Sequence, residues 1–157
     1  MIELLVAVSI GIVMMGFGII SVSKFLTREH VTTAKSEVIS AVKMARNYAI
    51  TAQPPDGFAD GQLDYIMVTI DANKRLVITA RNLTVGVGTS YYAKVIGGDD
   101  VTITTSGNIL FSIPEGKLLI NGSTPADSAY AVTVNISSKD GTAGPVTVSV
   151  DAGGKIW

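Results

Sequence analysis

The chain contains no cysteine, one histidine and one tryptophan among its 157 residues. The lack of cysteine excludes disulfides, thiol catalysis and cysteine-ligated metals. Charged residues are also few, 16% of the chain against about 25% in typical soluble proteins. Hydrophobic residues reach 47%, and the mean hydropathy is +0.42. The net charge of −1 gives no electrostatic basis for a nucleic-acid partner. This composition excludes a charged disordered chain and indicates a membrane segment.

The excess hydrophobicity is concentrated in residues 4–23, an uncharged run between Glu3 and Lys24. About 20 apolar residues in a helix rise roughly 30 Å, enough to cross a hydrocarbon core. The leucine, isoleucine, valine and phenylalanine side chains favour insertion by roughly 3–7 kcal/mol in total. We therefore predict a membrane-spanning helix here. The acidic flank and the helical pattern that follows argue against a cleaved signal peptide.

The charges around this run leave its orientation open. Lys24 and Arg28 follow the run, and nothing basic precedes it. By the positive-inside rule, the C-terminal portion would stay in the cytoplasm. A head outside the cell requires that a cleaved basic leader once set the orientation.

An amphipathic pattern continues over residues 24–53, because apolar residues recur at spacings of three and four. This face consists of Val31, Ala34, Val38, Ala41 or Val42, Ala45, Ala49 and Ala52. Its many alanines allow close approach of whatever packs on it. Pro54 and Pro55 end the pattern. We predict one helix from Leu4 to Gln53, roughly 75 Å long at 1.5 Å per residue.

Residues 54–157 change to a period of two and predict a β-rich head with one modest core. The candidate strands are Asp64–Ile70, Arg75–Ala80, Tyr91–Ile96, Val101–Thr105, Ile109–Ile113, Lys117–Ile120, Tyr130–Ser137 and Val146–Val150. Turn chemistry lies at Asp71–Lys74, Pro114–Gly116, Lys139–Gly141 and Gly153–Gly154. The fold class is therefore α+β, with an antiparallel meander packed on the C-terminal half of the helix.

The chain thus divides into three segments: residues 1–23 (transmembrane helix), residues 24–53 (its amphipathic continuation) and residues 54–157 (the head). Formal charge follows the boundary, with +3 on residues 24–46 and −3 on residues 54–157. A basic stalk and an acidic head could attract each other between subunits, although exposed pairs contribute little.

The chain offers few groups for chemistry. His30 is the only histidine and lacks an orienting partner nearby in the sequence, so we expect a solvated helix residue and no catalytic residues. Oxygen-rich loops make Asp56, Asp60, Asp64, Asp99 and Asp100 calcium candidates, but their spacing does not follow the EF-hand pattern. We expect no enzyme activity, no cofactor and no resident metal.

The sequence gives little support for N-glycosylation or for DNA binding. Three sequons for N-glycosylation begin at Asn82, Asn121 and Asn135, a number close to chance in a Thr- and Asn-rich head. DNA binding would have to rely on a small set of lysines in an acidic head. These lysines are Lys117, Lys139 and Lys155.

The opening MIELLVAVSIGIV, which runs into a long amphipathic helix, resembles type IV pilins and pseudopilins. The matching residues are Ile2-Glu3-Leu4-Leu5 and the apolar run to Val22. The resemblance implies a pilin fold, in which the glutamate neutralises the N-terminal amine of the adjacent subunit as a filament grows. That role falls on Glu3, because a lone carboxylate in hydrocarbon is costly unless it is paired. The alternative is a glutamate at headgroup level that favourably caps a helix N-terminus.

Two features of the helix bear on assembly. Ala7 and Gly11 form a small-xxx-small pair that admits a neighbouring helix. The predicted assembly residues are therefore Glu3, Leu4, Leu5, Ala7 and Gly11. Helix flexibility is assigned to Gly11, Gly16 and Gly18, because each glycine costs about 1 kcal/mol relative to alanine.

The chain departs from the family pattern in two ways. Two residues precede Glu3, whereas family members usually have four, beginning with a methylated phenylalanine. The second half of the apolar run also lacks the proline that many relatives have. In the head, SAVKMARNYAITAQ, ILFSIPEGKLLI and VTVSVDAGGKIW loosely resemble H-type minor pseudopilins.

These resemblances imply a structural subunit of a type IV pilus-like filament. Its partners would be identical subunits in a helical homopolymer, the cytoplasmic membrane before assembly and the pilus assembly machinery. After assembly, the subunit would lie in an extracellular filament. Two alternatives stay open: a minor pilin or secretion pseudopilin, and a monomeric membrane-tethered β domain that binds a partner.

Overall fold

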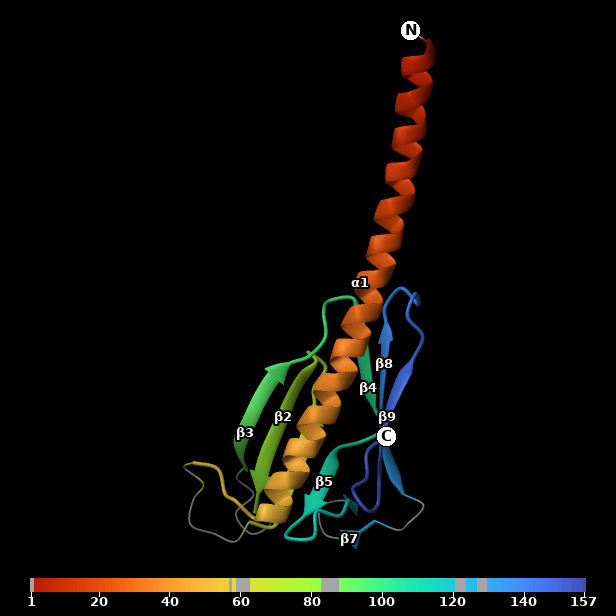
Figure 1. The fold of residues 1–157 in the computed structure, drawn as a ribbon. Coiled ribbons are helices and arrows are strands. Elements are labelled where there is room, and N and C mark those ends of the chain that lie inside the picture. Colours follow the sequence, from red (N-terminus) through yellow and green to blue (C-terminus); the bar gives the residue numbers. More distant parts are fainter. Residues whose placement is uncertain (1, 57, 59–62, 83–87, 121–123, 127–129) are drawn as a thin grey trace.

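A computed structural model of the chain describes residues 2–56, 58, 63–82, 88–120, 124–126 and 130–157. Within these ranges, residues 16–21 and 124–125 are described by their backbone alone. The fold is α+β, as predicted: one N-terminal helix packs on antiparallel sheets. The N-terminal half of this helix extends well beyond the sheets, and the C-terminal half lies along them (Figure 1).

Helix α1 (Ile2–Thr51) is continuous over 50 residues. It begins two residues before the predicted start and ends two residues before the predicted end. Ala52 follows in the left-handed region, with φ of 48°, a conformation that commonly closes a helix. Ala52 is exposed for this reason, so its predicted place on the packed face is wrong.

The rest of the predicted packed face is confirmed, because all its members are buried. They are Val31, Ala34, Val38, Ala41, Val42, Ala45 and Ala49. The small alanine side chains let the strand side chains approach the helix backbone closely, at the packing density of protein interiors. The bulk of the core therefore comes from the strands, led by Phe111, Ile66 and Leu76.

Nine strands are described in the head, and they form two main sheets and one small one, each antiparallel. The first sheet has the order β3-β2-β1-β5, with β1 (Tyr65–Ile70), β2 (Arg75–Arg81), β3 (Gly88–Val95) and β5 (Ile109–Ser112). The second has the order β4-β8-β9, with β4 (Val101–Thr105), β8 (Ala131–Ser138) and β9 (Val146–Asp151). The small one pairs β6 (Leu119–Ile120) with β7 (Thr124–Pro125).

The sheet order corrects the predicted single meander. Strands β1 to β3 do form one, but β4 joins the second sheet and β5 returns to pair with β1. Period-two alternation shows that a segment is a strand with one buried face. It does not show which strand lies beside it. Strand β7 was not predicted, because two residues carry no readable pattern.

Local turn chemistry agrees with the prediction at the β1–β2 hairpin. The Asp71 carboxylate accepts hydrogen bonds from the backbone N–H groups of Asn73 (2.8 Å) and Arg75 (2.9 Å). Lys74 adopts a positive φ of 59°. An aspartate that bonds the backbone two residues on is the expected start of such a turn.

Candidate assembly surface

The N-terminal half of α1, residues 2–26, is called here the projecting helix. Every large apolar side chain described in it is exposed: Ile2, Leu4, Leu5, Val6, Val8, Ile10, Ile12, Val13, Met14, Met15, Val22, Phe25 and Leu26. The exposed fraction reaches 77% at Ile2 and 72% at Leu4. Among the side chains described along α1, the first buried one is Thr27, at 7% exposed. Such a long run of exposed apolar residues marks an interaction surface in a natural protein.

The predicted membrane segment, residues 4–23, lies within the projecting helix. Among the residues that the structure describes in full, no helix offers a stretch both long and apolar enough to pass through a membrane.

All five predicted assembly residues lie on the projecting helix. Glu3 is in the first turn, where a carboxylate favourably faces the positive end of the helix dipole. Ala7 and Gly11 follow it at intervals of four, so the three residues share one side of the helix. Leu4 and Leu5 flank them and are exposed.

Gly11 leaves an open surface, since a Cβ built on it meets no atom within 4 Å. The backbone is helical throughout at Gly11, Gly16 and Gly18. The predicted loosening at these glycines is therefore not a break in the helix of the single chain, and it stays a prediction for the assembled state.

Two hydroxyl groups, one on the projecting helix and one on the residue that follows it, are hydrogen-bonded within α1. Ser9 Oγ donates to the Leu5 carbonyl (2.8 Å), and Thr27 Oγ1 donates to the Ser23 carbonyl (3.2 Å). This bonding to the preceding turn removes two donors that would otherwise need water. It makes the surface easier to transfer into an apolar environment.

The head holds the other half of α1 through side-chain links, beginning at His30. His30 Nδ1 lies 3.0 Å from both carboxylate oxygens of Asp100. The hydrogen bond from His30 is the main cause that lowers the pKa of Asp100. His30 is exposed on the helix, as expected, and its partner does not lie nearby in the sequence. Its partner is 70 residues away, which local sequence cannot reveal.

A second link joins α1 to the edge strand β3. Lys94 Nζ donates a hydrogen bond to Glu37 Oε1 at 2.6 Å. This bond, with the attraction of the Glu37 charge, raises the pKa of Lys94. Both side chains are partly exposed, so the pair contributes little to the free energy of unfolding.

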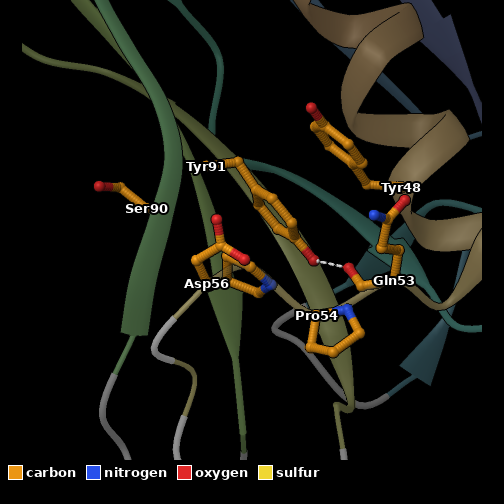
Figure 2. Close-up of a pocket in the computed structure, with 7 residues that line it drawn as sticks. Tyr48, Gln53, Pro54, Asp56, Ser90 and Tyr91 are labelled. Atoms are coloured by element: carbon orange, nitrogen blue, oxygen red, sulfur yellow. Dashed lines mark hydrogen bonds between the residues drawn. The ribbon is translucent and has the colours of Figure 1, made fainter.

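The third link is a pair of stacked tyrosines at the C-terminal end of α1. The ring centroids of Tyr48 and Tyr91 lie 4.3 Å apart, with 8° between the ring planes. Tyr91 Oη donates to the backbone carbonyl of Gln53 (Figure 2). Burial, and secondarily Tyr48, raise the pKa of Tyr91 to about 12. The stack and the Tyr91 hydrogen bond hold the segment that follows the helix next to β3.

A cavity of about 290 Å³ opens beside this stack (Figure 2). It is lined by Tyr48, Gln53, Pro54, Pro55, Asp56, Ser90 and Tyr91. Asp56 supplies its only described carboxylate. One carboxylate does not make the oxygen-rich shell that a calcium ion requires.

The fourth link uses Arg46, whose Nη2 donates to the Gly153 carbonyl at 3.1 Å. Gly154 next to it has φ of 75°. A Cβ on Gly154 would lie 2.6 Å from the Gly116 carbonyl oxygen and 2.8 Å from Arg46 Nε. Only glycine fits this close approach between the helix and the C-terminal segment.

The calcium candidates do not converge. Within the described part of the chain, no three His, Asp or Glu side chains are placed to hold a metal ion. Asp100 is engaged by His30, and Asp60 lies outside the described residues. Asp56, Asp64 and Asp99 therefore belong to no calcium-binding cluster made of described residues.

The sequons differ in their surroundings. Asn82 is buried, at 7% exposed, and is not presented to a modifying enzyme. Asn135 is exposed in the middle of β8. Asn121 lies outside the described residues. Of the three basic candidates for DNA, Lys155 is engaged over the Trp157 ring.

Comparison with protein-family models, with curated proteins and with solved structures gives no match for this chain.

Proposed function

We propose that this chain is a structural subunit of a type IV pilus-like filament, which polymerises through its projecting helix. The observation that carries this proposal is the division of α1. One half is held by the head through its core face and four side-chain links, and the other half leaves the head with its apolar side chains exposed. Such a helix requires a covering that the rest of the described chain does not supply.

The energy of that covering is large. Burial of one large apolar side chain contributes roughly 1.5–3 kcal/mol. Summed over the exposed side chains of the projecting helix, this gain exceeds the net stability of a typical domain, about 5–15 kcal/mol. A lipid bilayer before assembly and a bundle of identical helices after assembly would each provide it. Because both surroundings are apolar, transfer of the projecting helix from the bilayer to the bundle has a small free-energy cost.

Glu3 has the role of assembly residue in this proposal. In the bundle it would neutralise the N-terminal amine of a neighbouring subunit, which compensates for a carboxylate that has left water. The small residues Ala7 and Gly11 on the same side would let that neighbour approach. The head would form the outer surface, and the assembly machinery would move subunits from the cytoplasmic membrane into the filament.

A membrane-tethered β domain is the second candidate, favoured by the same exposed apolar side chains, which an anchor would also need. It requires no contact between copies and gives Glu3 no role. A minor pilin or pseudopilin would use the same helix contacts in few copies. These readings differ in how many copies share one helical array.

Cryo-electron microscopy of filaments sheared from the source cells tests the proposal. We expect a helical array whose side-chain density matches this sequence, with residues 4–23 at the axis. Filaments built from another protein, with this chain at a few copies per filament, would indicate a minor subunit. The chain recovered only as single copies in the membrane fraction would overturn polymerisation.

A further inference from the structure

The sheet formed by β4, β8 and β9 has one buried and one open face. Its valine and isoleucine side chains Val132, Val134, Ile136, Val148 and Val150 are buried in the core. The alternate positions point outward and are exposed or partly exposed. Seven of them carry a hydroxyl or an amide and are called here the hydroxyl face: Thr102, Thr104, Thr133, Asn135, Ser137, Thr147 and Ser149.

The strand register arranges the hydroxyl face in rows. Thr104 lies opposite Asn135, and Asn135 lies opposite Thr147. Thr147 Oγ1 donates to Asn135 Oδ1 at 2.8 Å, which orients both side chains. Thr133 faces Ser149 in the next row. Neighbouring side chains within a row are separated by the strand spacing of about 4.8 Å.

The C-terminal residues extend this face with an aromatic ring. Trp157 and Ser149 exchange two backbone hydrogen bonds, of 3.0 and 3.1 Å. This pairing places Trp157 on the same side of the sheet as Ser149. The Trp157 side chain is 58% exposed, and Lys155 Nζ lies 5.2 Å from its ring centroid. An exposed indole therefore borders the hydroxyl rows.

The hydroxyl face is uncharged, although the chain carries 25 Lys, Arg, Asp and Glu residues, 12 basic and 13 acidic. The nearest charged side chains lie at the Trp157 end of the sheet: Asp151 is the next outward position on β9 and accepts a hydrogen bond from the backbone N–H of Lys155 at 2.8 Å, and Lys155 Nζ lies over the Trp157 ring. Hydroxyls and amides both donate and accept hydrogen bonds. Along the seven residues of the hydroxyl face a charged partner finds no counter-charge, and at the Trp157 end Lys155 and Asp151 carry opposite charges. A lipid surface would leave the hydroxyl and amide groups unsatisfied.

We propose that the hydroxyl face and Trp157 bind a neutral polysaccharide. The hydrogen-bearing face of a pyranose ring packs on an exposed indole, and the sugar hydroxyls complement the rows of threonine, serine and asparagine. One sugar unit of an extended chain is close in length to the strand spacing, so successive units can meet successive strands. The inference concerns the head alone and holds whether or not the chain polymerises.

Trp157 is the only tryptophan, so its fluorescence reports directly on this face. The test is a titration of the full chain, held in a detergent without a sugar headgroup, with hexasaccharides of β-1,4-linked glucose, N-acetylglucosamine and mannose. We expect a saturable change in emission with at least one of them and none with the anionic hexamer of galacturonic acid. No response to any neutral probe would overturn the proposal.

Matched variants locate the binding. Thr104→Val and Thr147→Val keep a β-branched side chain and remove a hydroxyl, and each should weaken binding roughly two- to tenfold. Thr89→Val makes the same change on β3, in the other sheet, and should have no effect. Trp157→Ala, followed by affinity electrophoresis in a polysaccharide gel, should abolish retardation, and Trp157→Phe should restore part of it.

Two outcomes would contradict the assignment in other ways. Equal binding by Thr89→Val, Thr104→Val and Thr147→Val would place the sugar elsewhere on the molecule. A change in emission with protein concentration alone, without sugar, would assign the face to contact between copies of the chain.

Discussion

Residues 2–26 and residues 27–51 belong to one unbroken helix, yet their surroundings are opposite. The first half is covered with large apolar side chains that are exposed in the single chain. The second half buries one narrow face, rich in alanine, and carries charged residues elsewhere. The covered half has its partner within the same chain, whereas the projecting half must find its partner outside.

The comparison shows that side-chain size differs between the half of the helix that packs on the head and the half that projects from it. Alanines on the covered half let the two main sheets pack closely on one face of the helix. The large side chains around the projecting half present apolar surface in every direction, which suits a bilayer or a bundle of helices. Substitutions in the covered half should therefore change the stability of the head, and substitutions in the projecting half should change assembly.

The largest expected effect is on filament number. Glu3→Ala should still enter membranes but should assemble few filaments, because the amine of the neighbouring subunit loses its counter-charge. Glu29→Ala, which removes an exposed carboxylate from the same helix beyond the projecting part, is the matched control and should assemble normally. Filaments counted by electron microscopy provide the measurement. Normal counts for Glu3→Ala would remove its proposed role.

The next effect is on head stability. Ala45 is fully buried, and Ala45→Leu should lower the free energy of unfolding by about 1–3 kcal/mol through overpacking. Ala7→Leu makes the same change on the exposed half and should alter this free energy by less than about 0.5 kcal/mol. Denaturant titrations of the full chain in detergent compare them. Equal losses in both variants would contradict the division of the helix.

A smaller effect tests the contact between the covered half and the C-terminal segment. Gly154 and Gly141 have nearly equal φ, 75° and 73°, but a Cβ on Gly141 meets no atom within 4 Å. Gly141→Ala should cost about 1–2 kcal/mol from backbone strain alone. Gly154→Ala should cost more, because its Cβ would collide with the Gly116 carbonyl. Melting temperatures rank the two, and equal shifts would show that the close approach is unimportant.

The smallest effect is on stability at alkaline pH. The pKa of Tyr91 is raised from 10.0 to about 12, so the folded state keeps a proton that the unfolded chain has lost. Stability should therefore fall as pH rises from 10 to 12. Tyr91→Phe should flatten this fall, whereas Tyr65→Phe, in β1, should not. Unfolding curves at several alkaline pH values would show the difference, and identical curves for the two variants would contradict the raised pKa.

Much of the fold could be predicted from local patterns. The spacing of Val31, Ala34 and Val38 identified the packed face, and alternation located eight of the nine strands to within a few residues. A helix over the uncharged run was also predicted, because an uncharged run of this length is unusual, whereas the assembly role of its residues stays a prediction. The links that hold the helix were not predicted, since Asp100 and Tyr91 are distant in sequence from His30 and Tyr48.

The sequence by itself determined the periodicities: an uncharged run, an alanine-rich face that repeats with the helix, and strands with one apolar side. These depend on neighbouring residues and on backbone geometry alone. The tertiary structure decided which strands pair, with β4 beside β8 and β5 beside β1. It also decided which residues contact one another across the head. It also decided that the outward threonines of three strands line up beside Trp157. Such contacts join residues far apart in the chain, and a local pattern does not encode the partner.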